Sequence, residues 1–162
     1  MISRGLLLIY ISFLFISSVL AQKPYDEPIP TFVQDGQKWI YRDRAGNRVF
    51  SDEYKEAWFF NEGLAVVHQF GAYKYIDLNG KPVINNMYEI AGDFSEGRAV
   101  VKLPQTGRFY INNKGERVCE NEYQYLNKFK SGVGVGFRDF RYYLIDSNGK
   151  EIAGPFDWVD AF

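Results

Sequence analysis

Apolar and polar side chains alternate along several short segments, which is the pattern of β-strands with one buried face. Residues 73–77 read Tyr-Lys-Tyr-Ile-Asp, so the tyrosines and the aspartate lie on one side of an extended backbone. Three other short segments contain β-branched valine, which suits a pleated, half-buried surface: residues 64–67, 98–101 and 133–136. No segment combines the helical period with capping residues, although residues 53–60 could form a helical turn. The pattern predicts an all-β fold.

One unit is repeated along the chain, as the spacing of its glycines shows. Gly46, Gly80, Gly115 and Gly149 are separated by 34, 35 and 34 residues. An aromatic residue follows each of them at eight residues, or at seven in the last case: Tyr54, Tyr88, Tyr123 and Phe156. A phenylalanine stands six residues further on: Phe60, Phe94, Phe129 and Phe162. Two residues after each of the first three begins a pair that ends in glycine, at 62–63, 96–97 and 131–132, and we call each such pair a corner. We expect about four tandem three-stranded β repeats of about 34 residues each.

Each repeat is expected to contain a hairpin, a loop anchored by the tyrosine, and a returning strand. The Asn-Gly pairs at 79–80 and 148–149 favour two-residue hairpin turns, because both central positions of such turns need positive φ. An aliphatic residue recurs after the turn, and we expect it to be buried in a second strand: Val49, Val83, Val118 and Ile152. One position of the third strand stays small, which indicates close approach of a neighbouring strand or ring: Ala65, Ala99 and Gly134.

The two ends of the array are incomplete in complementary ways. Residues 31–33 lie where a third strand would precede the first copy, and the fourth copy reaches Phe162 before its own third strand. Repeat arrays must cover their end faces, so these halves either close a ring, as in β-propellers, or serve as caps. The expected architecture is a solenoid-like stack or a small closed propeller-like array.

The N-terminus has the parts of an export signal. Residues 1–21 place Arg4 before an apolar run that ends in Val-Leu-Ala, so we expect a signal peptide cleaved after Ala21. A buried helix and an uncleaved membrane anchor are the alternatives. Residues 22–30 contain three prolines and are expected to form a tether before a repeat domain over 31–162. The mature protein is then periplasmic, secreted or on the cell surface, without a membrane span.

Composition narrows the possible chemistry. Lysine and arginine number 19 against 20 acidic residues, and neither sign is gathered into a run, so a nucleic-acid interface is not expected. A single histidine and a single cysteine exclude an internal disulfide and a zinc site with several histidines. Aromatic residues reach 18%, and a chain of this size needs such large side chains to build a core.

The repeat resembles that of the WG (or KWG) repeat family, and the chain looks like a divergent member. Residues 75–77, 80–81 and 94–97 match the family's Tyr-Ile-Asp, Gly-Lys and Phe-x-Glu-Gly elements. The resemblance covers about residues 36–162. The tryptophan of the family name survives only as Trp39, and the glycine after it is replaced in every copy. The resemblance implies a β-repeat scaffold and transfers no catalytic residues to this chain.

No combination of residues predicts catalysis, a metal or a cofactor. We call the equivalent positions of successive copies a column. The column of His68 contains no nucleophile or orienting carboxylate, so we interpret His68 as a surface histidine on a strand. Cys119 shares its column with apolar residues and is expected to be a packed thiol, with an intermolecular disulfide as the alternative. An acidic or amide residue precedes each turn, which indicates turn capping rather than calcium binding: Asp43, Asp77, Asn112 and Asp146. The corner acids Glu62 and Glu96 have the same structural explanation.

Aromatic residues offer the clearest candidates for function. One column lies in the first strand of each copy: Trp39, Tyr73, Arg108 and Tyr142. The first copy also contains an aromatic pair without an equivalent in the other copies, Trp58 and Phe59. Such a face suits protein anchors or sugar rings if it meets solvent, and it is core if it points inward. We expect an exported, non-enzymatic module that binds or scaffolds another protein. A glycan of the cell envelope is the alternative ligand.

Overall fold

The structure, a computed structural model, describes residues 27–159 and consists almost entirely of β-strands and turns. The predicted signal peptide and most of the tether lie outside these residues. The elements are β1 (Ile29–Val33), the 3-10 helix η1 (Gln34–Gly36), β2 (Lys38–Arg42), β3 (Glu56–Ala57), β4 (Leu64–Gln69), β5 (Ala72–Asp77), β6 (Ile90–Ala91), β7 (Ala99–Lys102), β8 (Arg108–Ile111), β9 (Tyr125–Leu126), β10 (Gly134–Arg138), β11 (Arg141–Ile145) and β12 (Glu151–Phe156). The predicted all-β fold is confirmed, and residues 53–60 contain β3 rather than a helical turn.

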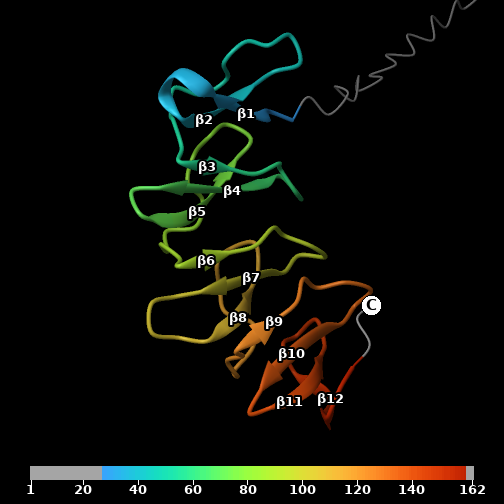
Figure 1. The fold of residues 1–162 in the computed structure, drawn as a ribbon. Coiled ribbons are helices and arrows are strands. Elements are labelled where there is room, and N and C mark those ends of the chain that lie inside the picture. Colours follow the sequence, from blue (N-terminus) through green and yellow to red (C-terminus); the bar gives the residue numbers. More distant parts are fainter. Residues whose placement is uncertain (1–26, 160–162) are drawn as a thin grey trace, which may run out of the picture.

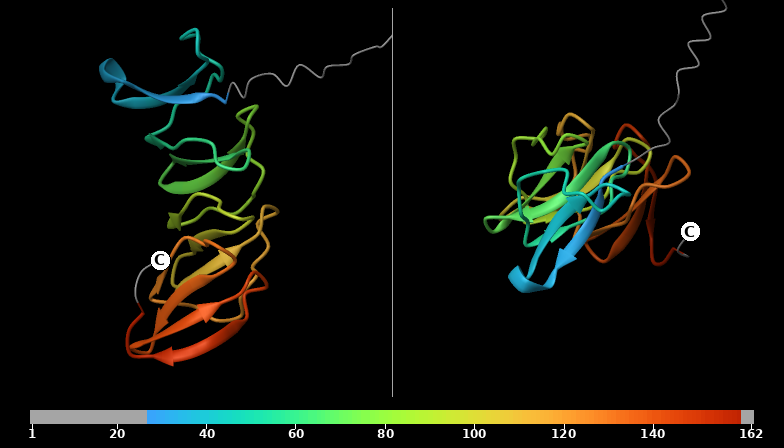
Figure 2. Two further views of the ribbon diagram at one scale, coloured as in Figure 1. Left: turned by 90° about the vertical axis from the view of Figure 1, so that its right-hand side faces the viewer. Right: turned by 90° about the horizontal axis from the view of Figure 1, so that it is seen from above.

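Small antiparallel sheets follow one another along the molecule in chain order (Figures 1 and 2). Their strand orders are β1-β2, β3-β4-β5, β6-β7-β8 and β12-β11-β10-β9. The last three sheets share one construction: a two-residue strand, the strand that follows the corner, and the first strand of the next sequence copy. Each sheet therefore combines residues from two consecutive copies, which joins neighbouring copies by backbone hydrogen bonds.

The two ends of the array lie far apart. β1 and β12 are at opposite ends of the molecule (Figures 1 and 2), and among the described residues no strand pair joins them. The described strands thus do not close into a ring. The predicted orphan strand is present as β1, which pairs with β2 and places Phe32 opposite Trp39. It begins at Ile29, two residues before the expected start of the domain, because Ile29 and Pro30 already pair with Arg42 and Tyr41.

The turns at the glycine column differ from the prediction. At residues 77–81 the Gly80 N–H donates to the Asp77 carbonyl at 2.9 Å, and the Asp77 N–H donates to the Lys81 carbonyl at 2.9 Å. This is a three-residue connection in which Gly80 has a φ of 77° and Asn79 is not among the residues with positive φ. Such a connection contains a bulge, so the strand that follows is shifted by one residue relative to a two-residue hairpin.

The prediction that the aliphatic residue after each turn is buried is wrong, and the bulge is the reason. Val49, Val83 and Ile152 are 44%, 42% and 52% exposed. The residue after each of the first two is buried instead, because a one-residue shift moves every side chain to the opposite face: Phe50 and Ile84. Cys119 occupies the same buried position in the third copy.

Two-residue turns with positive φ at both central positions lie at the corners instead. Glu62 and Gly63 have φ values of 53° and 79°. Asn61 and Leu64 exchange both backbone hydrogen bonds across them, at 2.8 and 3.0 Å. The corners at 96–97 and 131–132 repeat this geometry. The glutamate before the glycine therefore adopts a left-handed conformation that few side chains other than Asn and Asp favour.

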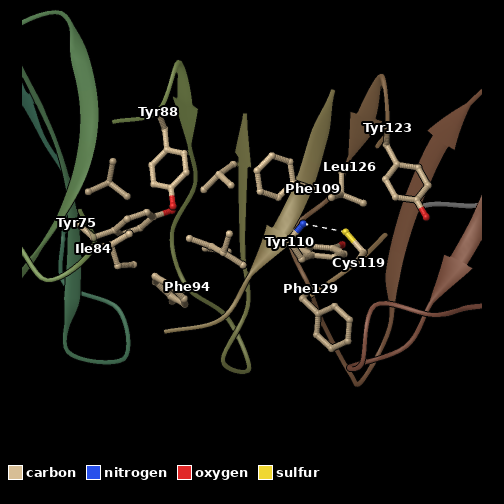
Figure 3. Packing of buried hydrophobic residues seen from close by; sticks show 14 of the residues in the cluster. Tyr75, Ile84, Tyr88, Phe94, Phe109, Tyr110, Cys119, Tyr123, Leu126 and Phe129 are labelled. Atoms are coloured by element: carbon tan, nitrogen blue, oxygen red, sulfur yellow. Dashed lines mark hydrogen bonds between the residues drawn. The ribbon is translucent and has the colours of Figure 1, made fainter. Parts of the chain in front are cut away.

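Clusters of aromatic side chains fill the space between successive sheets (Figure 3). Each of the first three copies contributes two tyrosines and a phenylalanine that are nearly inaccessible: Tyr41, Tyr54 and Phe60, then Tyr75, Tyr88 and Phe94, then Tyr110, Tyr123 and Phe129. The first tyrosine of each set donates its hydroxyl to a loop carbonyl at 2.7 Å, at Trp58, Gly92 and Asn127 respectively. This bond satisfies the buried hydroxyl and ties the loop to the preceding sheet.

The small column of the third strand has the expected cause. A Cβ atom on Gly134 would lie 2.2 Å from the Tyr110 hydroxyl oxygen, and one on Gly136 would lie 2.4 Å from the Tyr123 ring. The tyrosine rings of the third copy pack directly against the backbone of that copy's returning strand. The predicted close approach is confirmed at Gly134.

Replacing Gly149 by alanine is expected to destabilise the protein more than the same change at Gly46. Both glycines close equivalent turns at positive φ, but a Cβ atom on Gly149 would lie 2.0 Å from the Val118 carbonyl oxygen, and one on Gly46 would have nothing within 4 Å. The left-handed conformation costs roughly 1–2 kcal/mol at either site. The backbone overlap adds roughly 1–3 kcal/mol at Gly149 alone. Urea unfolding of the two variants measures the difference, and equal losses would contradict the packing of this turn.

Candidate interaction surface

The first-strand column is half-buried and is spread over the successive sheets. Its members are Trp39 in β2, Tyr73 in β5, Arg108 in β8 and Tyr142 in β11. The rings of Trp39 and Tyr142 pack on their cross-strand neighbours Phe32 and Phe137, with centroids 5.5 and 4.8 Å apart. The Arg108 guanidinium donates to the Gln124 carbonyl. The column is thus neither core nor a freely exposed series of rings.

An aromatic patch lies where the first two copies meet, made of two sequence neighbours and a tyrosine ring that one of them contacts. Trp58 and Phe59 follow β3 and are 36% and 65% exposed. The Trp58 ring meets the edge of Tyr73, with centroids 5.7 Å apart. The Tyr73 hydroxyl donates to Glu56 Oε2 at 3.2 Å. We call Trp58, Phe59 and Tyr73 the Trp58 patch; it joins the extra aromatic pair to one member of the predicted column.

The backbone beneath the Trp58 patch is held from both sides. The Trp58 N–H donates to the Val66 carbonyl at 3.1 Å. The Trp58 carbonyl accepts the Tyr41 hydroxyl at 2.7 Å. Because Tyr41 is fully buried, this bond connects the exposed indole directly to the core. The patch therefore presents large rings from a fixed backbone, which lowers the entropy lost when a partner binds.

The prediction that His68 lies on the surface is wrong. His68 is only 9% exposed, and its ring lies 4.5 Å from that of Tyr73. It occupies β4, the central strand of its sheet, on the face toward the next sheet. Its Nδ1 atom is buried and has no hydrogen-bond partner among the described residues. The alternation along β4 predicts which residues share a face with His68, but it does not predict that the next sheet buries this face.

Several exposed aromatic residues were not singled out from the sequence. Phe70 and Phe140 are 90% and 84% exposed at the turns between β4 and β5 and between β10 and β11, with φ values of 54° and 61°. Trp158, after β12, is 70% exposed. The missing signal was the pairing of one copy's last strand with the next copy's first, which places residues 70–71 and 139–140 at hairpin tips.

The acidic and amide column before each turn caps that turn. Oδ1 of Asp77 accepts the N–H groups of Asn79 and Lys81, both at 2.9 Å. Asn112 and Asp146 accept the corresponding pairs of N–H groups, and Asp43 accepts the N–H of Asn47. The hydrogen bonds from Asn47 hold the pKa of Asp43 below its usual value. The role predicted for these side chains is the one they have in the structure.

The corner glutamates connect neighbouring copies rather than capping their own turns. Glu62 Oε2 accepts the Gly97 N–H at 2.9 Å. The Glu96 carboxylate accepts the N–H groups of Ser131 and Gly132 at 2.7 and 2.8 Å. Each carboxylate thus holds the two-residue turn of the following copy, and the corners form a chain of contacts along one side of the array.

Replacing Glu96 by alanine is expected to lower the free energy of unfolding by about 1 kcal/mol, since two charge-assisted hydrogen bonds are lost at an exposed site. Glu120, also exposed, is the matched control and should change stability little when replaced by alanine. Thermal unfolding at low and high salt measures both variants. A loss at Glu120 as large as that at Glu96 would contradict a specific role for the corner.

The half-buried Glu151 carboxylate and the buried Cys119 thiol both have hydrogen-bond partners. Glu151 accepts hydrogen bonds from Tyr123 at 2.7 Å and from Arg138 at 3.2 Å. Burial raises the pKa of Glu151, but these bonds outweigh burial and hold it below the usual value. Cys119 is buried and its Sγ accepts the Tyr110 N–H at 3.2 Å (Figure 3). Burial raises the pKa of this thiol, so it resists ionisation and packs as an apolar residue.

Within residues 27–159, no group of three or more His, Cys, Asp or Glu side chains is arranged to hold a metal ion. No helix in this part of the chain has the length and apolar character to cross a membrane.

Two segments of the chain match a model of a known repeat. None of the curated proteins compared gave a significant match. Among solved structures, the chain is similar to the WD40 β-propeller domain of Doa1, with 11% identity and a TM-score of 0.38; the match covers 76% of this chain and 52% of that one. The chain thus matches about half of that domain's length. The model of the WG containing repeat matches residues 43–69 and 75–103. The chain thus contains two repeats that match the WG-repeat family.

Proposed function

We propose that the protein is an exported, non-enzymatic module, an open solenoid-like stack of about four repeats, that binds another protein through the Trp58 patch. The observation that carries the proposal is the combination of exposure and rigidity at Trp58 and Phe59. Both rings meet solvent, and the Trp58 backbone is bonded to β4 and to the buried Tyr41. Exposed tryptophan on a preorganised backbone is typical of the anchor residues of protein interfaces.

The polar surroundings of the patch support the same function. Glu56 and its hydrogen bond to Tyr73 lie beside the rings, which gives an aromatic centre with a charged rim. Interfaces commonly combine such a centre with polar groups around it. The glycan alternative has less support, because Trp39, Tyr73 and Tyr142 are half-buried in separate sheets and do not form a continuous platform for sugar rings.

The proposal is tested by affinity capture from envelope extract of the source organism. The baits are the wild-type protein, Trp58→Ala/Phe59→Ala, and Met87→Ala as a control at a site that is 66% exposed. One protein should be enriched by wild type and control, and its retention should fall more than about tenfold with the double variant, since anchor residues contribute on the order of 2 kcal/mol each. Binding of the captured protein is then repeated with purified components.

Two results would count against the proposal. Equal retention by the double variant would remove the Trp58 patch from the interface. Retention of polysaccharide without an enriched protein would favour the glycan alternative. The half-buried Trp39 and Tyr73 are poor choices for this test, because replacing them also removes packing and therefore lowers stability.

A further inference from the structure

Within residues 27–159, the first sheet lacks a strand that the following sheets have. In β3-β4-β5, β6-β7-β8 and the last sheet, a two-residue strand lies along the outer edge of the strand that follows the corner. In the first sheet β1 holds the position of β4, because Phe32 pairs with Trp39 as His68 pairs with Tyr73. Among the described residues β1 pairs with β2 alone. Its outer edge is the place where a two-residue strand is missing.

Residues 158–159 occupy the column of the two-residue strands. Phe156 pairs with Tyr142, as Tyr54 pairs with Trp39 and Tyr123 with Arg108. Two residues after these tyrosines, the chain enters β3 and β9. The same count from Phe156 leads to Trp158 and Val159, which belong to none of the described strands. The two ends of the array thus carry the two halves of one further sheet.

Aromatic side chains at both ends are exposed at positions that are covered inside the array. Phe156 is 39% exposed, whereas Tyr54, Tyr88 and Tyr123 in the same column are 1–2% exposed. Phe32 is 50% exposed, whereas its counterpart His68 is 9% exposed and the other counterparts, Lys102 and Phe137, are half-buried. Exposed aromatic rings at the termini of a repeat array indicate faces that take another layer, because free ends are normally polar.

The halves cannot meet within one molecule, since β1 and β12 lie at opposite ends of it (Figure 1). We propose that the protein associates head to tail, with residues 158–159 of one copy pairing along the edge of β1 in a second copy. A second copy is the fitting partner because both surfaces follow the register of the same repeat. The contact joins two different surfaces, so it extends into chains or closes into rings of copies.

The register of the contact follows from the existing sheets. Glu56 lies opposite His68, Ile90 opposite Lys102 and Tyr125 opposite Phe137. By the same rule Trp158 lies opposite Phe32 of the second copy, and Val159 opposite Thr31. The residue before each two-residue strand donates its N–H to that partner's carbonyl at 2.8–2.9 Å, from Lys55, Glu89 and Gln124. The Asp157 N–H takes this place in the contact and donates to the Phe32 carbonyl.

The receiving end has the features that this contact needs. Pro30 has no N–H to donate to an added strand. The matching residue of the last sheet, Val135, donates its N–H to the Asn127 side chain at 2.6 Å. A backbone donor to the neighbouring strand is therefore not required at this position. A surface hollow of about 410 Å³ lies beside the first sheet, where Val33 and Ile40 stand among charged side chains such as Lys38. It offers room for side chains of both kinds at the joint.

The test uses protein expressed from the full sequence and purified as the host exports it, with its mass read by mass spectrometry. Its molar mass is measured by sedimentation over a range of concentrations. Wild type should show a mass that grows with concentration. Phe32→Glu and Trp158→Glu should each stay monomeric, and Met87→Glu should behave like wild type. Because Phe32 and Trp158 are 50% and 70% exposed, both variants should still fold and unfold in one cooperative thermal transition, recorded at a concentration where wild type is monomeric.

Mixing the two variants gives the decisive result. Each retains one intact end, so a mixture of Phe32→Glu and Trp158→Glu should form dimers and nothing larger. A cross-link checks the register: Thr31→Cys and Val159→Cys proteins should form a disulfide with each other under mild oxidation. A wild-type mass that stays monomeric, a Phe32→Glu variant that still associates, or a mixture that stays monomeric would each overturn the proposal. None of these outcomes depends on Trp58 or Phe59, so the proposed protein-binding function is tested separately.

Discussion

Raising the pH above 10 is expected to unfold the protein in one steep transition. Six tyrosines are at most 2% exposed: Tyr41, Tyr54, Tyr75, Tyr88, Tyr110 and Tyr123. Burial raises the pKa of Tyr54 to about 12, and it raises the pKa of the other five as well. In the unfolded chain these phenols ionise near a pKa of about 10. The folded state therefore holds more protons above pH 10, and its stability falls as the pH rises.

The size of this effect follows from the number of groups. Each tyrosine that stays protonated only in the folded state removes about 1.4 kcal/mol of stability for every pH unit above its unfolded pKa. Tyrosine ionisation, followed by ultraviolet absorbance, should coincide with loss of β-structure followed by circular dichroism. Gradual ionisation of all tyrosines in a protein that stays folded would contradict the burial of these rings.

Tyr54→Phe and Tyr75→Phe separate the hydroxyls from the rings. The Tyr54 hydroxyl has no hydrogen-bond partner among the described residues, so its removal should leave neutral-pH stability unchanged or higher. The Tyr75 hydroxyl donates to the Gly92 carbonyl at 2.7 Å, so its removal should cost on the order of 1 kcal/mol. Both variants should show a shallower loss of stability above pH 10.

Replacing Tyr88 by alanine is expected to lower the free energy of unfolding by about 3–5 kcal/mol, since it removes a ring from the middle of the core. Tyr88 is 1% exposed, its ring packs against Tyr75 with centroids 6.0 Å apart, and its backbone exchanges two hydrogen bonds with Tyr73. Phe94→Ala, at a residue that is 2% exposed, should have a similar effect. Urea unfolding at pH 7 measures both.

Tyr125→Ala is the matched control for this deletion. Tyr125 belongs to the same residue type but is 56% exposed in β9, so its replacement should cost less than about 1 kcal/mol. A change below about 1 kcal/mol at Tyr88 would mean that the repeated tyrosine column is not core. Equal losses at Tyr88 and Tyr125 would contradict the burial pattern.

Much of this fold could be predicted from recurring residues. The spacing of Gly80 and its equivalents located the turns, and Tyr88 and Phe94 marked buried positions because large rings repeat only where packing requires them. The small column at Gly134 was interpreted correctly for the same reason. A residue type that recurs in every copy indicates that its position has the same surroundings in each copy.

The turn types could not be assigned from Asn-Gly and Glu-Gly pairs alone. Both pairs place glycine at positive φ, and the choice between two and three residues depends on the neighbouring side chain. Asp77 accepts N–H groups two and four residues ahead, which favours the longer turn. Glu96 reaches past its own corner to the next copy. The Glu96 contact depends on how the copies stack, which no single copy encodes.

The candidate surface was only partly predictable for a related reason. Trp58 and Phe59 stood out because the other copies have no aromatic residues in their places. Whether Trp39 and Arg108 face solvent depends on the next sheet, and so does the burial of His68. These residues lie on strand faces that pack against a neighbouring copy. The alternation along a strand predicts which residues share a face, but not how much of that face the neighbouring sheet buries.

Hydrogen exchange at Val67, Val101 and Gly136 tests the central claim most directly, namely that consecutive copies share each sheet. Each of these residues lies opposite a residue of the next copy in its sheet, at Lys74, Phe109 and Tyr143 respectively. These amides should exchange slowly, through openings that approach global unfolding in free energy, and Glu96→Ala should speed exchange near Ser131 first. Exchange of all three amides at the rate of an unstructured peptide in the folded protein would contradict the shared sheets.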